Sequence, residues 1–450
     1  MKLPAYREYN DSSIEWLGDL PADWEIKKLK HLGDAQIGLT YEPSEVVSEE
    51  EGTLVLRSSN VQAGKISLGD NIYVQKQIPR KLVTKEGDIL ICSRNGSRAL
   101  IGKNAMIDRL SAGVTFGAFM TIFRSEVNRY LYWVFNSLLF EYQSGSFLTS
   151  TINQLTVGNL NSFEVPLPPP SDQRAIADFL NTQTAKIDAL LAKKRELIDK
   201  LKEKRTALIS RTVTRGLPPE AARAVGLDPH PPMKASGVDW LGDVPEHWRT
   251  LPLKYVASIT TGYAFSSDDF VDEGVPVLRI GDISKDGNVD LNNAKYLPDD
   301  YVRTYRNVLV LQGDIVMAMT GATIGKAGRY LSCKSALLNQ RVCIFRPNNN
   351  NHPGYLWYLV NSRYYTEHIS LTAFGGAQPN ISDKQLLECS VPIPIPDEQR
   401  AIADYLDYET ARIDRMVTKA EGAIERLQEY RTALITSAVT GKIDVRGAAA

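Results

Sequence analysis

The stretch DQRAIADFL at residues 172–180 returns as EQRAIADYL at residues 398–406, 226 positions further along the chain. A match of this length at one fixed distance indicates an internal repeat. Three other pairs of segments occur in the same order in both halves: EWLGDLPADW (15–24) with DWLGDVPEHW (239–248), GDILICSRNGSRALIGK (87–103) with GDIVMAMTGATIGK (313–326), and KRTALI (204–209) with YRTALI (430–435). The chain of 450 residues therefore consists of two copies of a unit of about 220 residues.

The repeated stretch opens a segment in which the distance between the copies never changes. From Val165 to Thr214 the offset holds at 226, whereas earlier in the unit it varies between 222 and 226. Surface loops tolerate insertions, but one extra residue in a packed helix rotates everything after it by ~100°. No proline or glycine interrupts residues 172–213, and Ser171 or Asp172 can cap the start, as Asp397 can in the second copy. Each copy therefore predicts a long helix of ~40 residues.

Apolar residues recur in both predicted helices at alternating spacings of four and three. They are Ile176, Leu180, Ile187, Leu190, Leu197, Leu201 and Leu208 in the first helix, and Ile402, Leu406, Ile413, Met416, Ala423, Leu427 and Leu434 in the second. Such a heptad stripe is typical of helices that pack against another helix, so we expect the two helices to pair with each other. The alternative is that each helix packs only on its own globular domain.

The segments before the helices predict two domains that mix strands and helices. LVLRSSNVQ (54–62), VPVLRIGDI (275–283), DILIC (88–92) and DIVMAM (314–319) have the apolar character of short strands, and RYLYWVFNSLLF (129–140) and GYLWYLVNSRYY (354–365) that of amphipathic helices. The fold class is therefore α+β. The predicted parts are a first domain at 1–169, a spacer helix at 170–214, a proline-rich linker at 215–237, a second domain at 238–395, a second spacer helix at 396–441 and a tail at 442–450.

Composition excludes few functions and indicates where the chain works. The net charge is −1 and charged residues make up 23%, so DNA binding would have to use local basic patches. The four cysteines form no CxxC pair and the five histidines do not cluster near them, which predicts no zinc site. The N-terminal residues lack the apolar core of a signal peptide, and no apolar run reaches the ~18 residues of a membrane span. We therefore expect a cytoplasmic protein.

Motifs of common catalytic sites are missing from both copies. GATIGK (321–326) has three residues between its glycines where a phosphate-binding loop needs four, and Ala327 follows the lysine, so it predicts a glycine-containing hairpin. The sequence contains no GxSxG, no HExxH and no Asn/Asp-Pro-Pro-aromatic tetrapeptide of adenine methylation. We therefore expect no catalytic residue, no metal ligand and no cofactor in this chain.

The loops instead carry side chains of the types that proteins use to contact bases and phosphates. Arginine can bond guanine edges bidentately, asparagine and glutamine can bond adenine, and lysine suits phosphates. The candidate DNA-binding residues are Arg57, Ser59, Asn60, Gln62, Lys65, Arg94, Asn95, Arg98 and Lys103 in the first copy, and Arg279, Asp282, Lys285, Thr320, Thr323, Lys326, Gln340, Arg341, Gln378 and Asn380 in the second. Each of them taken alone could be an ordinary solvated side chain. Corresponding loop positions carry different side chains in the two copies, and this difference favours a role in DNA recognition.

The repeated openings WLGDLPADW and WLGDVPEHW, the GDIL…IGK and GDIV…IGK segments, and VPLPPPSDQRAIADFL and VPIPIPDEQRAIADYL together resemble the specificity subunits of type I restriction–modification systems. The resemblance implies two target recognition domains, each reading one half of a split site in double-stranded DNA, held apart by an antiparallel coiled coil. It also implies a non-catalytic chain that assembles with two modification subunits, which bind S-adenosylmethionine, and with restriction subunits that use ATP and Mg²⁺. The expected partner contacts are Gln173, Arg174, Gln399 and Arg400.

The similarity of NDSSIEWLG (10–18) to KASGVDWLG (234–242) suggests that the start of the chain lies near its C-terminal helix. Two other functions stay open at this point. One is a methyltransferase or nuclease that acts alone through an unrecognised site, and the other is a coiled-coil scaffold that binds only proteins.

Overall fold

The computed structural model of the protein describes residues 3–146, 153–239, 241–284, 286–348, 350–375 and 379–448. The chain forms two compact units: unit 1 comprises Met1–Arg195 and Glu421–Ala450, and unit 2 comprises Glu196–Ala420. Two long helices, α4 (Pro170–Arg215) and α10 (Pro396–Val439), contribute one part to each unit. The two predicted long helices are thereby confirmed, although α4 begins at Pro170, so that Ser171 and Asp172 lie inside its first turn.

Unit 1 contains the globular part that precedes α4. Its elements are β1 (Tyr9–Asp11), β2 (Asp19–Pro21), β3 (Glu25–Lys28), β4 (Asp34–Ile37), β5 (Val46–Val47), β6 (Thr53–Leu56), β7 (Val61–Gln62), β8 (Lys65–Ile66), β9 (Tyr73–Val74), β10 (Ile89–Cys92), β11 (Asn104–Met106), β12 (Thr115–Phe116), β13 (Met120–Arg124), α1 (Asn128–Phe135), α2 (Leu138–Ser146), α3 (Val157–Ser162) and β14 (Glu164–Leu167). Two four-stranded sheets form its centre, ordered β11-β10-β13-β4 and β12-β6-β9-β5.

Unit 2 repeats this plan with the globular part that precedes α10. Its elements are α5 (Pro219–Ala224), β15 (Met233–Ala235), β16 (Asp243–Pro245), β17 (Arg249–Pro252), β18 (Ala257–Thr261), β19 (Val275–Leu278), β20 (Lys295–Leu297), α6 (Tyr301–Thr304), β21 (Leu309–Val310), β22 (Ile315–Ala318), β23 (Ala327–Arg329), β24 (Ala336–Leu338), β25 (Val342–Pro347), α7 (Pro353–Val360), α8 (Arg363–Thr372), α9 (Asp383–Glu388) and β26 (Ser390–Ile393). Its two four-stranded sheets are ordered β18-β25-β22-β23 and β20-β19-β24-β21.

The first sheet of each unit has the same strand order, but the second sheet does not. In unit 1 the outer strand β5 pairs with β9, whereas in unit 2 the outer strand β21 pairs with β24, on the other side of the sheet. The sequence offset also varies in this region, because insertions are tolerated at sheet edges and loops. The predicted strand 54–62 overlaps β6, and the predicted strands 88–92, 275–283 and 314–319 contain β10, β19 and β22. GATIGK lies in the hairpin loop between β22 and β23. Gly325 in that loop has a φ of 79°, which a glycine adopts without strain.

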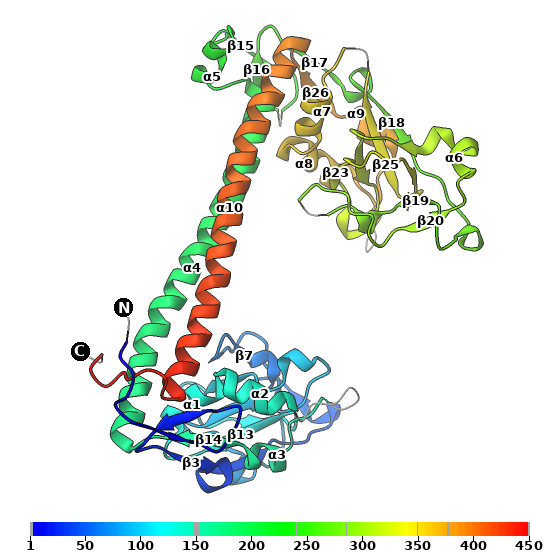
Figure 1. The fold of residues 1–450 in the computed structure, drawn as a ribbon. Coiled ribbons are helices and arrows are strands. Elements are labelled where there is room, and N and C mark those ends of the chain that lie inside the picture. The colour runs from blue at the N-terminus through cyan, green and yellow to red at the C-terminus, as the bar shows by residue number, and fades with distance from the viewer. Residues whose placement is uncertain are drawn as a thin grey trace. The chain divides into compact units, whose positions relative to one another are not determined.

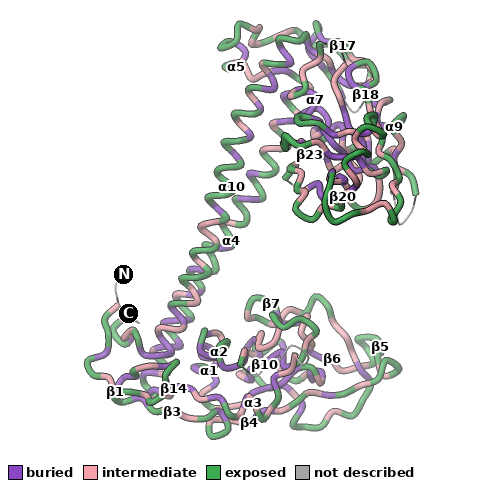
Figure 2. Tube along the Cα trace, turned by 45° about the vertical axis from the view of Figure 1, so that its right-hand side comes forward, coloured by how far each residue is buried: buried purple, intermediate pink, exposed green. Residues whose placement is uncertain are grey.

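Buried residues gather inside each globular part and recur along each long helix (Figure 2). In unit 1 the main cluster joins Trp133 and Phe163 of the globular part to Ile176 and Leu180 of α4. In unit 2 the corresponding cluster joins Trp248 and Tyr355 to Leu406 of α10. Each long helix therefore packs on the globular part that precedes it, as the alternative interpretation required.

The two long helices also pair with each other in both units, as Figure 1 shows. In unit 1 the Arg431 Nε lies 3.0 Å from the Asp188 Oδ1, and in unit 2 the Arg205 Nε lies 3.0 Å from the Asp414 Oδ1. Each residue of one pair stands 226 positions from its equivalent in the other pair, so the two contacts repeat one another. Because the partner number falls on α10 as it rises on α4, the helices run antiparallel. The predicted pairing is confirmed.

The buried stripe on the helices departs from the predicted one at several positions. Leu190 and Leu197 were predicted to be buried but are 47% and 43% exposed, while Leu191 and Ile198 are 6% and 7% exposed. Met416 on α10 is likewise exposed, contrary to prediction. The sequence offers two adjacent apolar residues at each of the first two places, so spacing alone could not decide between them. The predicted members that are buried are Ile176, Leu180, Ile187, Leu201, Ile402, Leu406, Ile413 and Leu434.

The two aromatic segments predicted as single helices are each divided into two. The division falls at Asn136–Ser137 between α1 and α2 and at Asn361–Ser362 between α7 and α8. The Ser362 hydroxyl accepts the Tyr365 amide at 3.2 Å and so caps a new helix. Serine and asparagine compete with helical hydrogen bonds through their own side chains, which explains the break at this pair.

A buried tyrosine fastens each globular part to the strand that leads into its own long helix and to the end of the other long helix. In unit 1 the Tyr130 hydroxyl lies 2.9 Å from the Pro166 carbonyl oxygen and 3.2 Å from that of Val439 at the end of α10. In unit 2 the Tyr355 hydroxyl lies 2.7 Å from the Pro392 oxygen and 3.2 Å from that of Val213 near the end of α4. The same side chain thus repeats the same attachment in both copies.

The segments around Pro4–Tyr9 and Gly441–Asp444 contact each other within unit 1. The Tyr9 hydroxyl donates to the Gly441 carbonyl oxygen at 2.8 Å, and the Asp444 amide donates to the Pro4 carbonyl oxygen at 2.8 Å. This confirms the prediction that the start of the chain lies near its C-terminal helix. In unit 2, β15 from the proline-rich segment pairs with β16 as β1 pairs with β2 in unit 1. That segment is therefore structured where the sequence suggested a plain linker.

Candidate nucleic-acid interface

The first predicted loop follows β6 in unit 1 and β19 in unit 2, and it is organised from within. A 3₁₀ turn, Ser58–Asn60 in unit 1 and Ile280–Asp282 in unit 2, places the last side chain of the turn back against the strand end. Asn60 is fully buried and its Oδ1 accepts the Arg57 amide at 2.9 Å. Asp282 is 7% exposed and its Oδ2 accepts the Arg279 amide at 2.7 Å.

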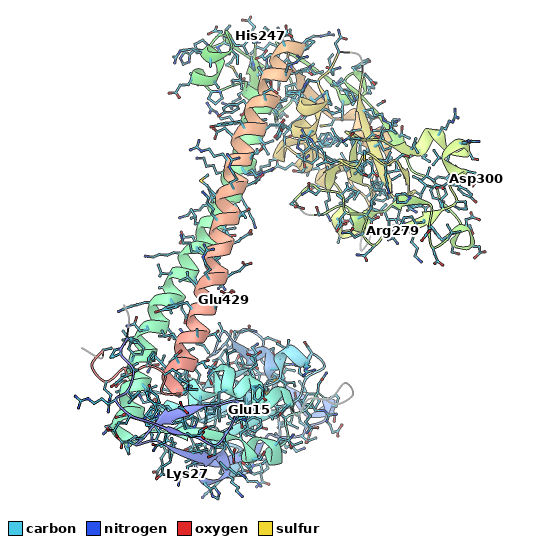
Figure 3. The ribbon with its side chains drawn as sticks, viewed as in Figure 1. Glu15, Lys27, His247, Arg279, Asp300 and Glu429 are labelled. Carbon is cyan, nitrogen blue, oxygen red and sulfur yellow. The ribbon has the colours of Figure 1, made fainter. Side chains whose placement is uncertain are left out.

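The two arginines of this loop are also engaged within the chain. The Arg57 Nη2 lies 3.0 Å from the Asp70 Oδ2, and the Arg279 Nη2 donates to the Asn293 carbonyl oxygen at 2.9 Å. Figure 3 labels Arg279 in the globular part of unit 2. The Gln62 amide donates to the Ser59 carbonyl oxygen at 2.8 Å. Arg57, Asn60, Arg279 and Asp282 therefore shape their loops, and their contact with DNA stays a prediction.

A second group of predicted residues forms a surface in unit 1 from three segments of chain. The Phe119 carbonyl oxygen accepts the amides of Ser93 and Arg94, both at 3.0 Å, and the Ser93 carbonyl oxygen accepts the Leu155 amide at 2.7 Å. Arg94 also bridges to Gln154 through the backbone. We call Ser93–Asn95, Phe119 and Asn153–Leu155 surface 1. The backbone hydrogen bonds fix the three segments beside one another at the end of β10.

The corresponding place in unit 2 has the same backbone pattern. The Arg341 carbonyl oxygen accepts the Met319 amide at 3.0 Å, the Met319 carbonyl oxygen accepts the Ile381 amide at 3.1 Å, and Thr320 bridges to Asn380. We call Met319–Thr320, Gln340–Arg341 and Asn380–Ile381 surface 2. These residues and Thr261 line a hollow of about 430 Å³. Four predicted residues, Thr320, Gln340, Arg341 and Asn380, are thus brought together.

Arg94 and Phe119 are the exposed side chains of surface 1, and the sequence did not single out Phe119. Phe119 is 58% exposed, and the Arg94 guanidinium carbon lies 5.3 Å from the centre of its ring. Among the described residues no carboxylate lies within ion-pair distance of Arg94 or of Arg341. This separates them from Arg57 and Arg279. The Asn95 amide lies 3.4 Å from the Ser58 hydroxyl and so joins surface 1 to the first loop.

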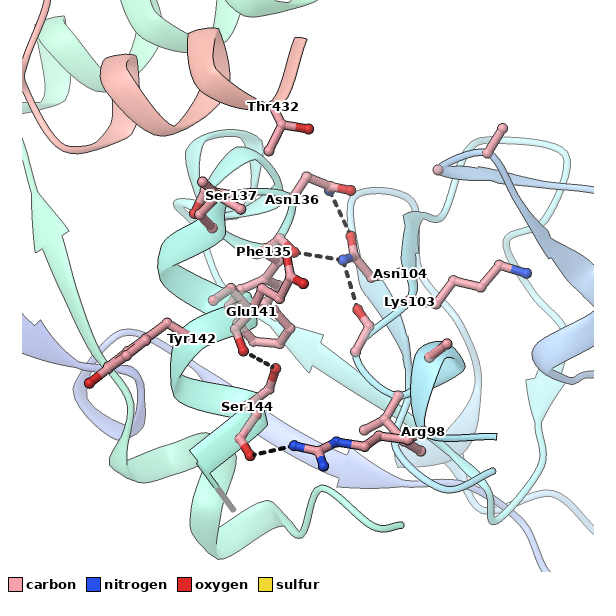
Figure 4. Close-up of a pocket in the computed structure, with 18 residues that line it drawn as sticks. Arg98, Lys103, Asn104, Phe135, Asn136, Ser137, Glu141, Tyr142, Ser144 and Thr432 are labelled. Atoms are coloured by element: carbon pink, nitrogen blue, oxygen red, sulfur yellow. Dashed lines mark hydrogen bonds between the residues drawn. The ribbon is translucent and has the colours of Figure 1, made fainter. Parts of the chain in front are cut away.

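Arg98 and Lys103 lie apart from surface 1, on a groove of about 1120 Å³ (Figure 4). The loop that carries them faces α1 and α2, with Asn136 and Tyr142 among the lining residues and Thr432 contributed by α10. The Arg98 Nη2 donates to the Gly145 carbonyl oxygen at 3.3 Å. In unit 2, Thr323 and Lys326 lie in the equivalent loop between β22 and β23 and are partly exposed. Lys65 is exposed on β8.

Two predicted residues, Lys285 and Gln378, lie outside the described residues. Phe119 and Gln154 are among the members of surface 1 that sequence reasoning missed. Gln154 could have been found, because it stands 226 positions before the predicted Asn380. Phe119 could not, because its neighbours in β13 form the buried run of a core strand.

The four predicted partner contacts divide into two kinds. The Gln399 side chain is buried and its Nε2 donates to the Pro394 carbonyl oxygen at 3.0 Å, while the Gln173 Nε2 donates to the Pro168 oxygen at 2.7 Å. Both glutamines therefore fix the start of their helix. Arg174 and Arg400 are exposed in the first turns of α4 and α10.

No group of three or more His, Cys, Asp or Glu side chains in the described ranges is arranged to hold a metal ion. Among the helices of the described part, none combines the length and apolar character needed to cross a bilayer.

Comparison with known proteins gives one consistent result over nearly the whole chain. The family described as "Type I restriction modification DNA specificity domain" matches both copies, at residues 21–200 and 245–425. The chain is 25% identical over 457 residues to the type I restriction enzyme MjaVIII specificity subunit of Methanocaldococcus jannaschii, covering 98% of this chain and 97% of that protein. It is 23% identical over 449 residues to the EcoKI specificity subunit of Escherichia coli K12, covering 95% and 90%.

One solved structure has the same fold. It concerns complex assembly and conformational transition of the type I restriction–modification system. One of its chains aligns with a TM-score of 0.65 and 17% sequence identity, covering 93% of this chain and 98% of that chain.

Proposed function

Because the chain belongs to the family of type I restriction modification DNA specificity domains, we propose that surfaces 1 and 2 read the two halves of a split site in double-stranded DNA. The single observation that supports this assignment is the equivalence of the two surfaces. They share one backbone pattern, yet Arg94, Phe119 and Gln154 in unit 1 correspond to Thr320, Arg341 and Asn380 in unit 2. A constant scaffold with different hydrogen-bonding side chains reads different base sequences, so the site is asymmetric.

Phosphate contacts come from predicted lysines outside these surfaces. In unit 1 Lys65 is exposed on β8 and Lys103 lies on the groove beside α1 and α2, and in unit 2 Lys326 lies in the loop between β22 and β23. Affinity for DNA rises with the number of phosphates that a protein neutralises, and the chain as a whole has a net charge of −1. The isolated chain therefore binds DNA weakly, and partner subunits complete the positive surface around the duplex.

The partners are two modification subunits and the restriction subunits of the same system. Arg174 and Arg400 occupy equivalent exposed positions 226 residues apart, which suits one modification subunit for each copy of the repeat. S-adenosylmethionine is held by the modification subunits, and ATP and Mg²⁺ by the restriction subunits. The complex works on DNA in the cytoplasm.

Catalysis is supplied by the partners and not by this chain. The competing hypothesis is a methyltransferase or nuclease that acts alone. Ultraviolet cross-linking of labelled S-adenosylmethionine to the purified chain separates the two. We expect no labelling of the chain alone and labelling of the modification subunits in the complex. Labelled chain, or DNA cut or methylated by the chain alone, would favour the enzyme.

The experiment that tests the proposed function measures methylation of a library of DNA duplexes. The modification subunits are assayed with and without this chain. We expect sequence-specific adenine methylation only when the chain is present. Methylation of the same sequences in both mixtures would contradict its role in sequence recognition, and a complex indifferent to DNA sequence would favour a scaffold that binds only proteins.

A further inference from the structure

Arg94 has the chemistry of a guanine-reading residue, and its backbone is held in place. Its amide and that of Ser93 both donate to the Phe119 carbonyl oxygen at 3.0 Å, and the Ser93 hydroxyl donates to the same oxygen at 3.1 Å. Three hydrogen bonds on one carbonyl oxygen fix the loop at the base of the arginine side chain. The guanidinium itself is exposed, and none of the described residues offers it a carboxylate within ion-pair distance.

The Phe119 ring gives this long side chain a second point of support. The Arg94 guanidinium carbon lies 5.3 Å from the ring centre, within the ~6 Å over which a cation is attracted to an aromatic face. Phe119 itself is 58% exposed. A ring that holds the guanidinium lowers the conformational entropy that the arginine loses when it binds a base.

In unit 2 the arginine stands on the other of the two corresponding segments of chain. Thr320 occupies the place of Arg94, and Arg341 occupies the place of Phe119, because Met319 bonds the Arg341 carbonyl oxygen as Ser93 bonds that of Phe119. In unit 2 the guanidinium is therefore carried by the segment that corresponds to Phe119, and not by the segment that corresponds to Arg94. Arg341 is exposed beside Asn380 on the rim of the 430 Å³ hollow.

We propose that Phe119 is a positioning residue that orients Arg94 for bidentate hydrogen bonds to one guanine in the half-site of unit 1, and that Arg341 supplies the guanine-reading group of unit 2. The inference rests on the proposed function and adds to it the base and the residues that read it. Phe119 acts through Arg94 and makes no base contact of its own. None of the described aromatic rings lies in cation–π contact with Arg341, which therefore acts without such a support in the described part of the chain.

The test uses the complete complex and a set of duplexes in which each base pair of the recognised site is changed in turn. The measured quantity is discrimination, the ratio of methylation rates on the original and the changed duplex. Arg94→Ala should lower discrimination at one guanine of one half-site by ~5- to 150-fold, the range for one bidentate base contact. Phe119→Ala should lower it at the same guanine by ~2- to 5-fold, and Phe119→Tyr should restore it because tyrosine keeps the aromatic face.

A double variant separates positioning from a general structural effect. If Phe119 acts through Arg94, Phe119→Ala should add no further loss to Arg94→Ala. Arg341→Ala is the matched variant and should affect one guanine of the other half-site only. The role of Phe119 would be overturned if the double variant lost more discrimination than Arg94→Ala alone. It would also be overturned if Phe119→Ala slowed methylation equally on every duplex.

The failure of this inference can be told from the failure of the proposed function. The wild-type complex comes first: if it shows no preference among the duplexes, the proposed function is wrong and the inference falls with it. If the wild type discriminates in both half-sites but Arg94→Ala and Arg341→Ala leave every ratio unchanged, only the inference is wrong.

Discussion

Asn60 and Asp282 end the same 3₁₀ turn in the two copies, but they differ in what they can donate. The Asn60 Nδ2 donates to the carbonyl oxygens of Ser67 and Asp70 at 3.0 and 3.1 Å. Asp282 is a largely buried carboxylate with no hydrogen to donate when ionised. Its pKa is raised by burial, although the Arg279 amide and charge act in the opposite direction. Compared with the unfolded chain, the folded chain therefore favours the neutral form of the Asp282 carboxyl. The stabilisation that this gives the folded chain at low pH is lost as the pH rises through the folded-state pKa.

Replacing this carboxylate by an amide should stabilise unit 2. We expect Asp282→Asn to raise the free energy of unfolding at neutral pH, because the amide still accepts the Arg279 hydrogen bond and carries no charge to bury. The gain should shrink towards and below the unfolded-state pKa of ~3.9, where the wild-type carboxyl is also neutral. Thermal unfolding at neutral and acidic pH measures it. A gain of equal size at both would contradict the assigned cause.

The reverse change in unit 1 is the matched control. Asn60→Asp should lower the free energy of unfolding by at least ~2 kcal/mol at neutral pH, because a buried carboxylate would face the Ser67 and Asp70 carbonyl oxygens. An unchanged unfolding transition would show that the loop opens to solvent and does not hold Asn60 in place.

The sequence identified which loops carry polar side chains, but it could not separate residues that shape a loop from residues that face outward. Arg57 bonds Asp70, 13 positions away, and Arg279 bonds Asn293, 14 positions away. Those partners lie in loops whose course is set by the sheets, so no local pattern predicts the contacts. Arg94 and Arg341 are loop arginines like Arg57, but they have no carboxylate partner among the described residues.

Among the elements, the long helices were predicted best and their stripe was predicted only in part. Length, the absence of proline and glycine, and the constant offset identified α4 and α10. The stripe contains Leu190–Leu191 and Leu197–Ile198, where each apolar pair allows two registers. The pairing of the helices selects Leu191 and Ile198, so the choice depends on tertiary packing and not on local sequence.

The selected register predicts unequal effects for two neighbouring leucines. Leu191→Ala should lower the free energy of unfolding by ~2–4 kcal/mol, because it removes a side chain that is only 6% exposed from the helix interface. Leu190→Ala, at a position 47% exposed, should change it by less than ~0.5 kcal/mol. Calorimetric unfolding of the two variants provides the comparison. If both variants lowered the free energy of unfolding equally, or Leu190→Ala lowered it more, the register that buries Leu190 would be supported instead.

Considered as a whole molecule, the chain is a duplication whose copies share their scaffold contacts and differ in the side chains of surfaces 1 and 2. The repeat was visible in the sequence, and with it the α+β class and the pairing of the helices. The different outer strands β5 and β21 were not, because short edge strands leave little periodicity in a sequence. Surface 1 and surface 2 required the fold, since each draws on three separate segments.

A whole-molecule prediction follows from the paired helices. If they set the distance between the two half-sites, inserting seven residues, about two helical turns, into both α4 and α10 should lengthen the unspecified gap and leave both half-sites unchanged. Sequencing of methylated DNA from cells that express the altered complex provides the measurement. The control carries seven extra residues in the loop between α4 and α5. An unchanged gap in the helix variant would show that the helices do not set the spacing.

The most direct test of the central claim is a genome-wide map of methylated adenines in a host that expresses the complete wild-type complex. Two units with different recognition surfaces predict one asymmetric site, made of two specified stretches separated by a gap of fixed length and free sequence. A single uninterrupted stretch, two identical half-sites, or methylation without a common sequence would contradict the account.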